Sequence, residues 1–370
     1  MITCEIKHGD ALTVLRSMES ESVQCVVTSP PYYGLRSYGT TPQIWDGDAD
    51  CQHIWGEEMA NPKTDTRPIE LKISQGATVG SNVASQHWAQ GTQGTFCQQC
   101  SAWRGELGLE PRFQLYISHL IQIFREVKRV LKSDGCCFVN LGDSYSGDSP
   151  VRNVTAEAFS KTWDTSQTRT NGGNRRSQVC SVPRKSLMNI PHRFFIAMTD
   201  DLQMIQRNNI NWWKRACMPS SATDRWTVDF ESIGFFTKNA KYKFNQDLEP
   251  QKNWGLRDRT NGKYHTADLH SIKGVTGVIN PEGRNARTTW DIAYEPSGED
   301  HYASYPTKLV EKMILAGSDA GDTVLDIFNG TASTGVAALR HRRNYIGIEL
   351  QDKYITISEM RLSKVQVKLF

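Results

Sequence analysis

Thr28-Ser29-Pro30-Pro31-Tyr32 combines residue types that could hold a planar amine. Two consecutive prolines fix φ and remove backbone donors, so the turn is stiff and its carbonyl oxygens are free to accept hydrogen bonds. The Ser29 hydroxyl precedes the prolines, and the aromatic face of Tyr32 follows them. Such a set could accept the hydrogens of an exocyclic amine while a planar base stacks on Tyr32. On this stretch alone, an ordinary Pro-Pro turn is an equally good interpretation.

A glycine-rich turn near the other end of the chain could hold a second ligand. Residues 329–335 follow a predicted buried strand, 323–328, and open a predicted helix at 336–339. Glycine lets a ligand approach the backbone closely. The next predicted strand, 345–349, ends in Glu349, where a ribose diol could be hydrogen-bonded. Strand, turn, helix, strand and terminal acid together are much stronger evidence for such a ligand site than the turn alone.

The elements that must position these residues follow from hydrophobic periodicity. Residues 23–27 read as a short buried strand, so the proline turn lies where a strand ends, which is where open α/β sheets bind ligands. Helical stripes predict core helices over 11–18, 113–131 and 191–207, and a helix that ends near Gly317; apolar runs predict strands at 4–10, 136–141 and 231–238.

With these motifs in place, the chain resembles the β-group DNA amino-methyltransferases. In that family the Ser-Pro-Pro-Tyr motif comes first and the Asp-x-Phe-x-Gly S-adenosylmethionine motif comes last, as at positions 326–330 here. The resemblance covers about 1–34, 113–145, 186–244 and 286–362. It implies an α/β, Rossmann-like, S-adenosylmethionine-dependent methyltransferase fold with a circularly permuted motif order. Ala332 replaces a usual glycine and Ile327 a common proline; neither change removes a charged or hydrogen-bonding group, so we expect both to be tolerated.

The resemblance also implies roles for particular residues. The catalytic set is Ser29, Pro30, Pro31 and Tyr32. In the family the acid after the first strand accepts from the adenine of the cofactor, which makes Asp10 a candidate, although a helix N-cap is an equal and compatible role. The segment around position 305 covers the methionine end of the cofactor. The cofactor-binding candidates are Asp10, Thr28, Tyr305, Thr307, Asp326, Phe328, Gly330, Thr331, Ser333, Thr334 and Glu349.

An insertion at 35–112 carries a candidate metal site. Cys51, His53, Cys97 and Cys100 make a complete tetrahedral zinc set, of which the Cys-x-x-Cys pair is the informative half. The intervening residues are rich in Gly, Ser, Thr and Gln, which fits a loop held shut by a structural Zn²⁺. A catalytic zinc is disfavoured because all four positions would be filled. Unrelated thiols are the alternative.

Two basic segments on a mildly acidic body suggest contact with nucleic acid. Residues 144–187 carry seven Lys or Arg against three Asp or Glu, and residues 238–289 carry ten against five. The plainer interpretation is two solvated loops without a partner. We expect contacts with double-stranded DNA from Arg36, Arg175, Arg176, Trp213, Lys214, Ser220, Arg257, Arg259, Arg284 and Arg287.

These features predict a division of the chain. Residues 1–34 and 113–244 form the catalytic half of the methyltransferase domain, and 290–370 form the cofactor-binding half. The insertions are the zinc segment at 35–112, a mobile basic loop at 146–186 and a DNA target-recognition region at 245–289.

The chemistry is bounded by what the chain lacks. Methylation of cytosine at carbon 5 uses a Pro-Cys thiolate in the family that performs it, and no Pro-Cys dipeptide occurs here. An exocyclic amine of a base flipped out of the duplex is the better acceptor. Serine at position 29 resembles the cytosine-N4 branch, which we favour. Adenine-N6 methylation is the alternative, and a zinc-containing DNA-binding protein without methyl transfer is a third.

Length and composition fit this assignment. The 370 residues can bury a large core, no apolar run reaches the ~18 residues of a membrane helix, and the N-terminus does not resemble a signal peptide. Nine scattered cysteines argue against a disulfide framework. We expect a cytoplasmic protein, bacterial or phage-encoded, that acts as a monomer or homodimer. A restriction endonuclease partner would be encoded separately.

Overall fold

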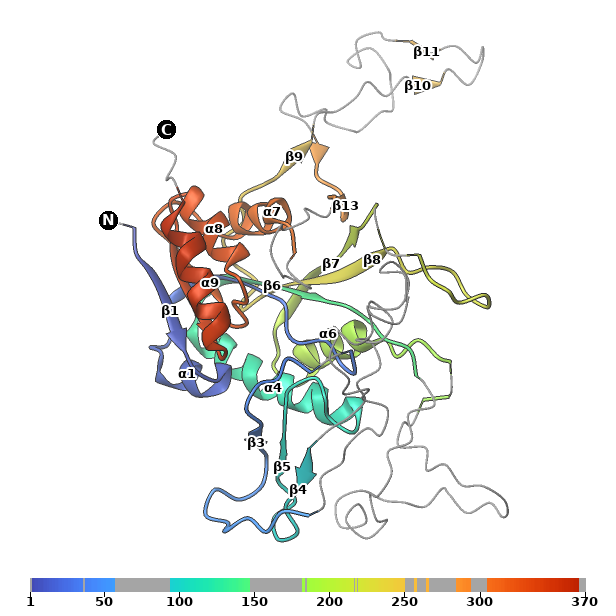
Figure 1. The fold of residues 1–370 in the computed structure, drawn as a ribbon. Helices are drawn as coiled ribbons and strands as arrows, with labels where there is room; N and C mark the ends of the chain where they lie inside the picture. Colours follow the sequence, from blue (N-terminus) through green and yellow to red (C-terminus); the bar gives the residue numbers. More distant parts are fainter. Residues whose placement is uncertain are drawn as a thin grey trace, which may run out of the picture.

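A mixed eight-stranded sheet forms the centre of the molecule (Figure 1). The computed structural model describes residues 2–35, 37–56, 94–146, 182–183, 185–215, 217, 219–249, 285–293 and 305–365, and the backbone of 256–257, 264–265 and 284. In spatial order the strands are β1 (Cys4–His8), β15 (Asn344–Glu349), β14 (Thr323–Asp326), β2 (Val23–Thr28), β6 (Leu131–Leu141), β8 (Phe230–Thr237), β7 (Ile205–Trp213) and β13 (Thr289–Asp291).

The strand directions bring several chain segments to one edge of this sheet. The first five strands in the spatial order are parallel, β8 is antiparallel to both of its neighbours, and β13 is parallel to β7. The carboxyl ends of the five parallel strands therefore meet at one edge, together with the first residues of β8 and the last residues of β7. We call this the carboxyl edge.

Helices cover both faces of the sheet (Figure 1). On one face lie α1 (Ala11–Ser17), α4 (Phe113–Val130) and α6 (Ile190–Asp200); on the other lie α7 (Thr307–Gly317), α8 (Ser333–Arg340) and α9 (Asp352–Ser363). Two apolar clusters correspond to these faces. Val26 of β2 belongs to the first cluster and its neighbours Cys25 and Val27 to the second. Because β2 is covered on both faces, its sequence is a continuous buried run.

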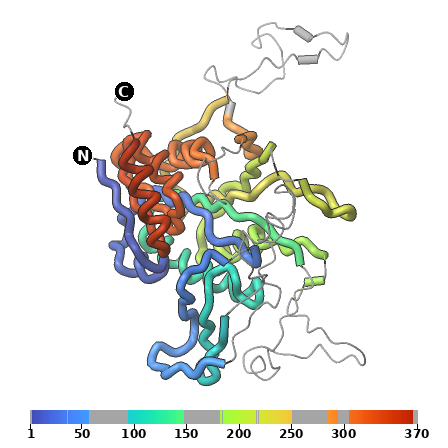
Figure 2. The backbone as a smooth tube through the Cα atoms, viewed as in Figure 1, coloured from blue at the N-terminus to red at the C-terminus, as the bar shows by residue number. Residues whose placement is uncertain are grey.

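The two ends of the chain build the same side of the sheet. Figure 2 shows the blue N-terminal segment beside the red C-terminal part, and β1 pairs in parallel with β15 from Cys4 opposite Tyr345 to His8 opposite Glu349. The Gly9 N–H then donates to the Glu349 carbonyl at 2.9 Å. The turn after the first strand is thereby fixed beside the last strand.

A small antiparallel sheet projects from the α1–α4–α6 side. It contains β3 (Gln43–Trp45), β5 (Trp103–Gly105) and β4 (Thr95–Phe96), in the order β3-β5-β4. Trp45 and Trp103 are buried and stack on His119 of α4, with ring centroids 4.6 and 5.5 Å away. Two further two-stranded pairs join β9 (Leu248–Glu249) to β12 (Arg284–Asn285) and β10 (Leu256–Arg257) to β11 (Tyr264–His265).

The structure corrects one predicted helix. The helix expected over 191–207 ends at Asp200, and strand β7 begins at Ile205. Leu202 and Met204 stay buried, so their apolar character reflects the core and not a longer helix. Gln203, whose φ is 52°, lies between the end of α6 and the start of β7, and the residues from Ile205 onward pair with β8 and not with their own helix.

Among the described residues, no helix is long and apolar enough to cross a membrane.

Candidate functional site

Asp326, the last residue of β14, joins the two motifs that the sequence singled out. Its carboxylate is buried, and Oδ1 accepts from the Thr28 hydroxyl at 2.7 Å and from the Phe328 N–H at 3.1 Å. Oδ2 lies 2.9 Å from the Tyr305 hydroxyl and 2.6 Å from that of Thr334. Burial raises the pKa of Asp326, and these hydrogen bonds oppose the rise. The arrangement locks the turn after β14 to the end of β2.

Glu349 holds the other side of the glycine-rich turn. Its Oε2 accepts from the Gly330 N–H at 2.8 Å, and its Oε1 accepts from the N–H groups of Leu350 and Gln351 at 3.0 and 2.9 Å. Burial raises the pKa of this carboxyl, and the three N–H donors oppose the rise. Gly330 has a φ of 52°, in the left-handed region, and no atom closer than 4.0 Å to where a Cβ would stand. The turn therefore presents open backbone at the carboxyl edge.

The remaining cofactor candidates lie around this turn or at helix starts. Asp10 caps α1, since its Oδ1 accepts from the Thr13 N–H at 2.9 Å and the Thr13 hydroxyl at 3.0 Å. Thr331 is buried and bonded by Arg361, whose guanidinium donates to its carbonyl and hydroxyl, both at 2.6 Å. Ser333 and Thr307 are the first residues of α8 and α7.

The proline turn leaves β2 at the same edge. Ser29 is partly buried, and its Oγ lies 3.5 Å from the Tyr32 hydroxyl. The expectation of free carbonyls is wrong for Pro31, whose oxygen accepts from the Tyr116 hydroxyl of α4 at 2.7 Å. No hydrogen bond from the described part of the chain occupies the carbonyl of Pro30. Ser29 Oγ thus lies near the Tyr32 hydroxyl, and the next residue, Pro30, has a carbonyl without a partner in the described part of the chain.

A polar cluster that the sequence did not reveal surrounds the Tyr32 hydroxyl. This hydroxyl donates to Glu231 Oε2 at 2.7 Å, and Asn140 Nδ2 lies 2.9 Å from it and 2.7 Å from the same carboxylate oxygen. Lys214 pairs with Glu231 Oε1. Burial and the Glu231 carboxylate raise the pKa of Tyr32 well above its usual value, so the phenol stays protonated. The four residues come from the ends of β2, β6 and β7 and the start of β8.

Glu106, in the insertion, organises the segment that follows the proline turn. Its buried carboxylate accepts from the Ser37 hydroxyl at 2.6 Å, the Tyr38 N–H at 3.0 Å, and the N–H and hydroxyl of Thr40, both at 2.8 Å. The Tyr38 carbonyl in turn accepts from Gln351 Nε2 at 3.0 Å. The insertion therefore connects the proline turn to the end of β15.

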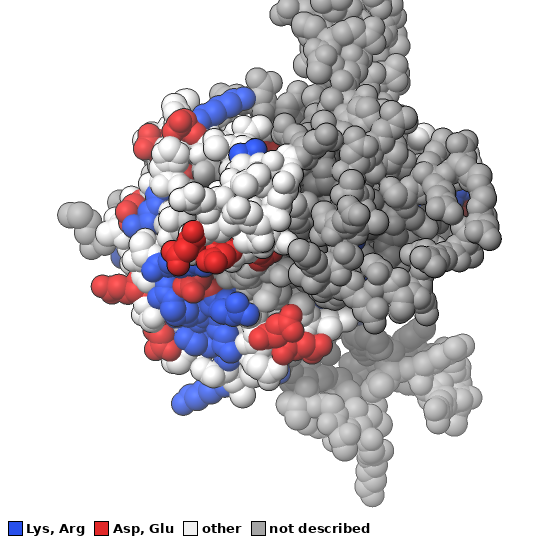
Figure 3. Space-filling model, turned by 90° about the horizontal axis from the view of Figure 1, so that it is seen from below, with Lys and Arg blue, Asp and Glu red and all other residues white. Residues whose placement is uncertain are grey.

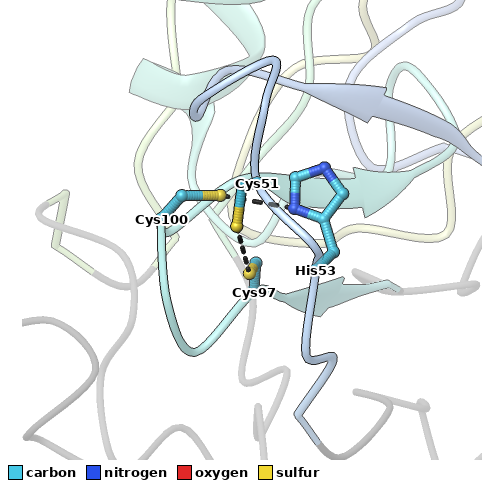
Figure 4. Close-up of side chains that lie close together, drawn as sticks. All are labelled: Cys51, His53, Cys97 and Cys100. Atoms are coloured by element: carbon cyan, nitrogen blue, oxygen red, sulfur yellow. Dashed lines mark hydrogen bonds between the residues drawn. The ribbon is translucent and has the colours of Figure 1, made fainter.

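Cys51, His53, Cys97 and Cys100 converge in the small sheet (Figure 4), and their ligand atoms all lie within 4.8 Å of one another. The Cys51 and Cys97 sulfurs are 3.9 Å apart, and the Cys100 sulfur is 3.3 Å from His53 Nδ1. Tetrahedral Zn–S bonds of ~2.3 Å place two sulfurs about 3.8 Å apart. Gly47, with a φ of 78°, leaves room, since a Cβ there would stand 2.9 Å from the Cys100 sulfur.

The candidate DNA contacts are placed less completely. Arg36, Arg175, Arg176 and Arg259 lie outside the described residues, as does most of the expected loop 146–186; Arg257 and Arg284 are described by backbone alone, in β10 and β12. Ser220 and Arg287 are exposed.

The two adjacent tryptophans of β7 differ. Trp212 is buried, whereas Trp213 is 39% exposed and donates to Asp229 at 2.9 Å. On the face seen in Figure 3, basic side chains gather in one patch, and acidic side chains border it.

The chain is similar in sequence to known DNA methyltransferases. The model of a DNA methylase family, N6_N4_Mtase, matches residues 23–360. The Type II methyltransferase M.Cfr9I of Citrobacter freundii is 29% identical over 360 residues, which cover 96% of this chain and 86% of that protein. M.SmaI of Serratia marcescens is 28% identical over 364 residues, which cover 97% and 91%.

Two solved structures share the fold. The PvuII DNA methyltransferase (cytosine-N4-specific) aligns with a TM-score of 0.54 and 16% identity, covering 99% of this chain and 88% of that one. A candidate DNA modification methylase of Thermus thermophilus, complexed with S-adenosyl-L-methionine, aligns with a TM-score of 0.51 and 19% identity, covering 100% and 96%.

Proposed function

The chain belongs to the DNA methylase family, and on that premise we propose that it transfers a methyl group from S-adenosylmethionine to the N4 amine of a flipped-out cytosine in double-stranded DNA. One contact carries this proposal. Thr28, the residue directly before Ser29, donates to Asp326, the last residue of the strand that leads into the glycine-rich turn. The residues that suit an amine acceptor and those that suit a nucleotide cofactor are thereby held at one edge of the sheet.

The residues around the turn after β14 fit S-adenosylmethionine. Oxygens of a carboxylate have more than one lone pair, so Glu349 Oε2 can accept from a ribose hydroxyl while it holds the Gly330 N–H. Phe328 offers a partly buried apolar side chain beside the turn. When bound, the cofactor supplies an electrophilic sulfonium methyl group. Asp10, Thr28, Tyr305, Thr307, Asp326, Thr331, Ser333 and Thr334 complete the set that would hold it.

The proline turn would bind the acceptor. The lone pair of an exocyclic amine is delocalised into its ring, so the site must accept the amine hydrogens and favour a pyramidal nitrogen. Ser29 Oγ and the Pro30 carbonyl are suited to this, while Tyr32 stacks on the base. As the bond between the amine nitrogen and the methyl group forms, the bond between the sulfonium and the methyl group breaks and leaves a neutral thioether. The methylated amine loses one proton during or after the transfer, so no strong base is needed. Charge complementarity and orientation supply most of the acceleration.

The choice of N4 over N6 rests on Ser29 and on relatives. Ser-Pro-Pro-Tyr resembles the cytosine-N4 branch, and one protein that shares the fold is described as cytosine-N4-specific. Adenine-N6 is the second candidate, because a hydroxyl can accept from either amine.

The proposal extends to the organisation and setting of the protein. We assign a permuted order in which 1–34 and 113–244 bind the target base and 290–370 bind the cofactor, with DNA recognition by 245–289 and phosphate contacts from 146–186. Relatives named as Type II methyltransferases support a role in a restriction-modification pair, with a separately encoded endonuclease. The bacterial sources of these relatives support a cytoplasmic location. We also propose that the protein acts as a monomer or homodimer.

The four clustered ligands in the small sheet would hold a structural Zn²⁺. The sulfur separation fits the tetrahedral edge, and four protein ligands leave no open position for substrate. Metal analysis of the purified protein should find about one zinc per chain. Cys97→Ser should lose that zinc and melt at lower temperature, whereas Cys4→Ser, a change at an exposed cysteine, should keep both. A wild-type protein that is purified without zinc and melts at the same temperature as Cys97→Ser would contradict the site.

Transfer of tritium from methyl-labelled S-adenosylmethionine to unmethylated genomic DNA tests the proposed function. The wild-type protein should label the DNA, and Ser29→Ala should lower the rate at least 100-fold while it binds the cofactor normally. Ser17→Ala, at the exposed end of α1, is the matched control. DNA binding without any label would favour the zinc-containing binding protein.

A further inference from the structure

Tyr32 is fixed at both ends by groups outside its own motif. Its ring lies against Gly142, where a Cβ would stand 2.4 Å from Tyr32 Cε2. Its hydroxyl donates to Glu231 and contacts Asn140. Because the hydroxyl oxygen lies on the long axis of the ring, its hydrogen bonds restrict the tilt of the ring, while the contact with Gly142 restricts rotation about that axis.

The acceptor at the centre of this cluster is Glu231. Its Oε2 accepts hydrogen bonds from the Tyr32 hydroxyl and from Asn140 Nδ2, and its Oε1 pairs with the Lys214 ammonium, so both oxygens act as acceptors. The Glu231 side chain is 14% exposed and Asn140 is 2% exposed. Removal of a partly buried acceptor leaves its donors without a partner, which disturbs their positions.

The strand directions explain why these groups meet at the proposed reaction site. Asn140 lies near the carboxyl end of β6, and Lys214 directly follows β7. Glu231 lies at the beginning of β8, and because β8 is antiparallel its beginning reaches the same edge. The cluster therefore lies next to Ser29, whose Oγ is 3.5 Å from the Tyr32 hydroxyl.

We propose that Glu231, supported by Asn140 and Lys214, is a positioning residue that holds the Tyr32 ring in the orientation needed to stack on the target base. This inference rests on the proposed methyl transfer and adds a residue to it. It assigns Lys214 first to Glu231 and not to DNA. Glu231 acts through Tyr32 and itself makes no contact with the transferred methyl group.

A double-mutant cycle between Glu231→Ala and Tyr32→Phe tests the role, with single-turnover methylation of unmethylated genomic DNA as the readout. Misplacement of a reacting group by about 1 Å costs roughly 100-fold, so Glu231→Ala should lower the transfer rate by about that factor. Cofactor affinity should change less than about twofold, because Glu231 does not contact the turn after β14. In the Tyr32→Phe background the further loss should fall below about threefold.

Conservative and control variants separate positioning from simple packing. Glu231→Gln keeps one oxygen that can accept from Tyr32 and Asn140, so it should retain a rate within about fivefold of the wild type. Gly142→Ala pushes on the ring directly and should reproduce the loss of Glu231→Ala. Glu126→Ala removes a carboxylate paired with Arg129 on α4 and should leave the rate unchanged.

Three results would overturn the role. They are a wild-type rate in Glu231→Ala, a full multiplicative loss in the double variant, or a Tyr32→Phe rate within about threefold of the wild type. The Tyr32→Phe rate can be measured even if Glu231→Ala does not fold, because Tyr32→Phe keeps the whole ring. A wild-type protein that transfers no methyl group to either base would contradict the proposed function itself, and with it this role.

Discussion

At the scale of single residues, one buried hydrogen bond connects the two halves of the site. Thr28→Val keeps the shape of the side chain but loses the hydroxyl that donates to Asp326. Since Asp326 Oδ1 keeps only the Phe328 N–H, the free energy of unfolding should fall by ~1–2 kcal/mol. Urea denaturation measures this directly. An unchanged midpoint would show that the contact contributes nothing to the fold.

Ala332 is a residue where the chain departs from the family pattern, and its φ of 59° lies in the left-handed region. Ala332→Gly relieves ~1–2 kcal/mol of backbone strain. It also removes a buried methyl worth ~0.8 kcal/mol and adds ~0.4–1 kcal/mol of unfolded-state entropy. These effects nearly cancel, so stability should change by less than about 1 kcal/mol.

Gly330→Ala is the comparison for that variant. Its φ of 52° is also left-handed, and a Cβ would meet open space, so the change adds strain of ~1–2 kcal/mol. The lower entropy of the unfolded chain offsets ~0.4–1 kcal/mol of this, and packing offsets little. Thermal unfolding of both variants gives the two values. A loss above about 2 kcal/mol in Ala332→Gly would mean that the methyl group packs far better than average.

The sequence identified most of the residues at the turn after β14 but missed Glu231. Asp326 and Thr334 belong to one local motif, Thr28 belongs to the proline turn, and the family resemblance implied Tyr305. The structure brings the four together. Glu231 is the second residue of β8, and no local sequence pattern shows whether that strand runs parallel or antiparallel to its neighbours. Only the antiparallel pairing of β8 with β6 brings it to Tyr32.

At the scale of elements, the small sheet is attached to α4 through a buried charge network. His119 is fully buried between Trp45 and Trp103. Its Nδ1 lies 3.0 Å from Glu110 and its Nε2 lies 3.1 Å from Asp46, so both ring nitrogens face carboxylates. Burial opposes a charge on His119, but these two hydrogen bonds outweigh it and raise its pKa.

A group whose pKa is raised in the folded state stabilises the protein below its unfolded pKa, ~6.5 for histidine, and loses that effect as pH rises through the folded pKa. His119→Gln should therefore cost about 3 kcal/mol at pH 6 and less at pH 9. The pKa of Asp46 is lowered by its hydrogen bond to His119, and its contribution is constant in this range.

Melting temperatures of the wild type and His119→Gln at pH 6, 7.5 and 9 test that expectation. The difference between the two proteins should narrow as pH rises. A difference that is constant, or that widens toward pH 9, would show that His119 is neutral in the folded protein.

Element boundaries were predictable where local periodicity and tertiary pairing agree. Helix α4 and strands β2, β8 and β15 occur where apolar spacing predicts them. The error at 201–207 arose because apolar residues at helical spacing there also fit a strand entering the sheet. The sulfur and imidazole ligands were predictable from type and spacing. The approach of Cys51 and His53 to the Cys-x-x-Cys pair depends on the pairing of β3 with β5 and on the bridge between Trp55 and Cys97.

At the scale of the whole molecule, the central sheet brings together two motifs that lie near opposite ends of the chain. β2 and β14 are far apart in sequence and neighbours in space, with Leu325 opposite Val26. The sequence contained both motifs, and the resemblance supplied their relation. Strand directions and the contacts of Glu106 and Glu231 required the three-dimensional arrangement.

We propose that the protein methylates the N4 amine of cytosine, and the identity of the labelled base tests this most directly. Incubation with unmethylated genomic DNA and methyl-labelled S-adenosylmethionine, followed by digestion to nucleosides and mass spectrometry, identifies the labelled base. The wild-type protein should place the label in N4-methylcytosine, and Ser29→Ala should lose it. Label in N6-methyladenine would contradict the choice of base while it preserves the site, and label in neither base, on DNA from several sources, would contradict methyl transfer.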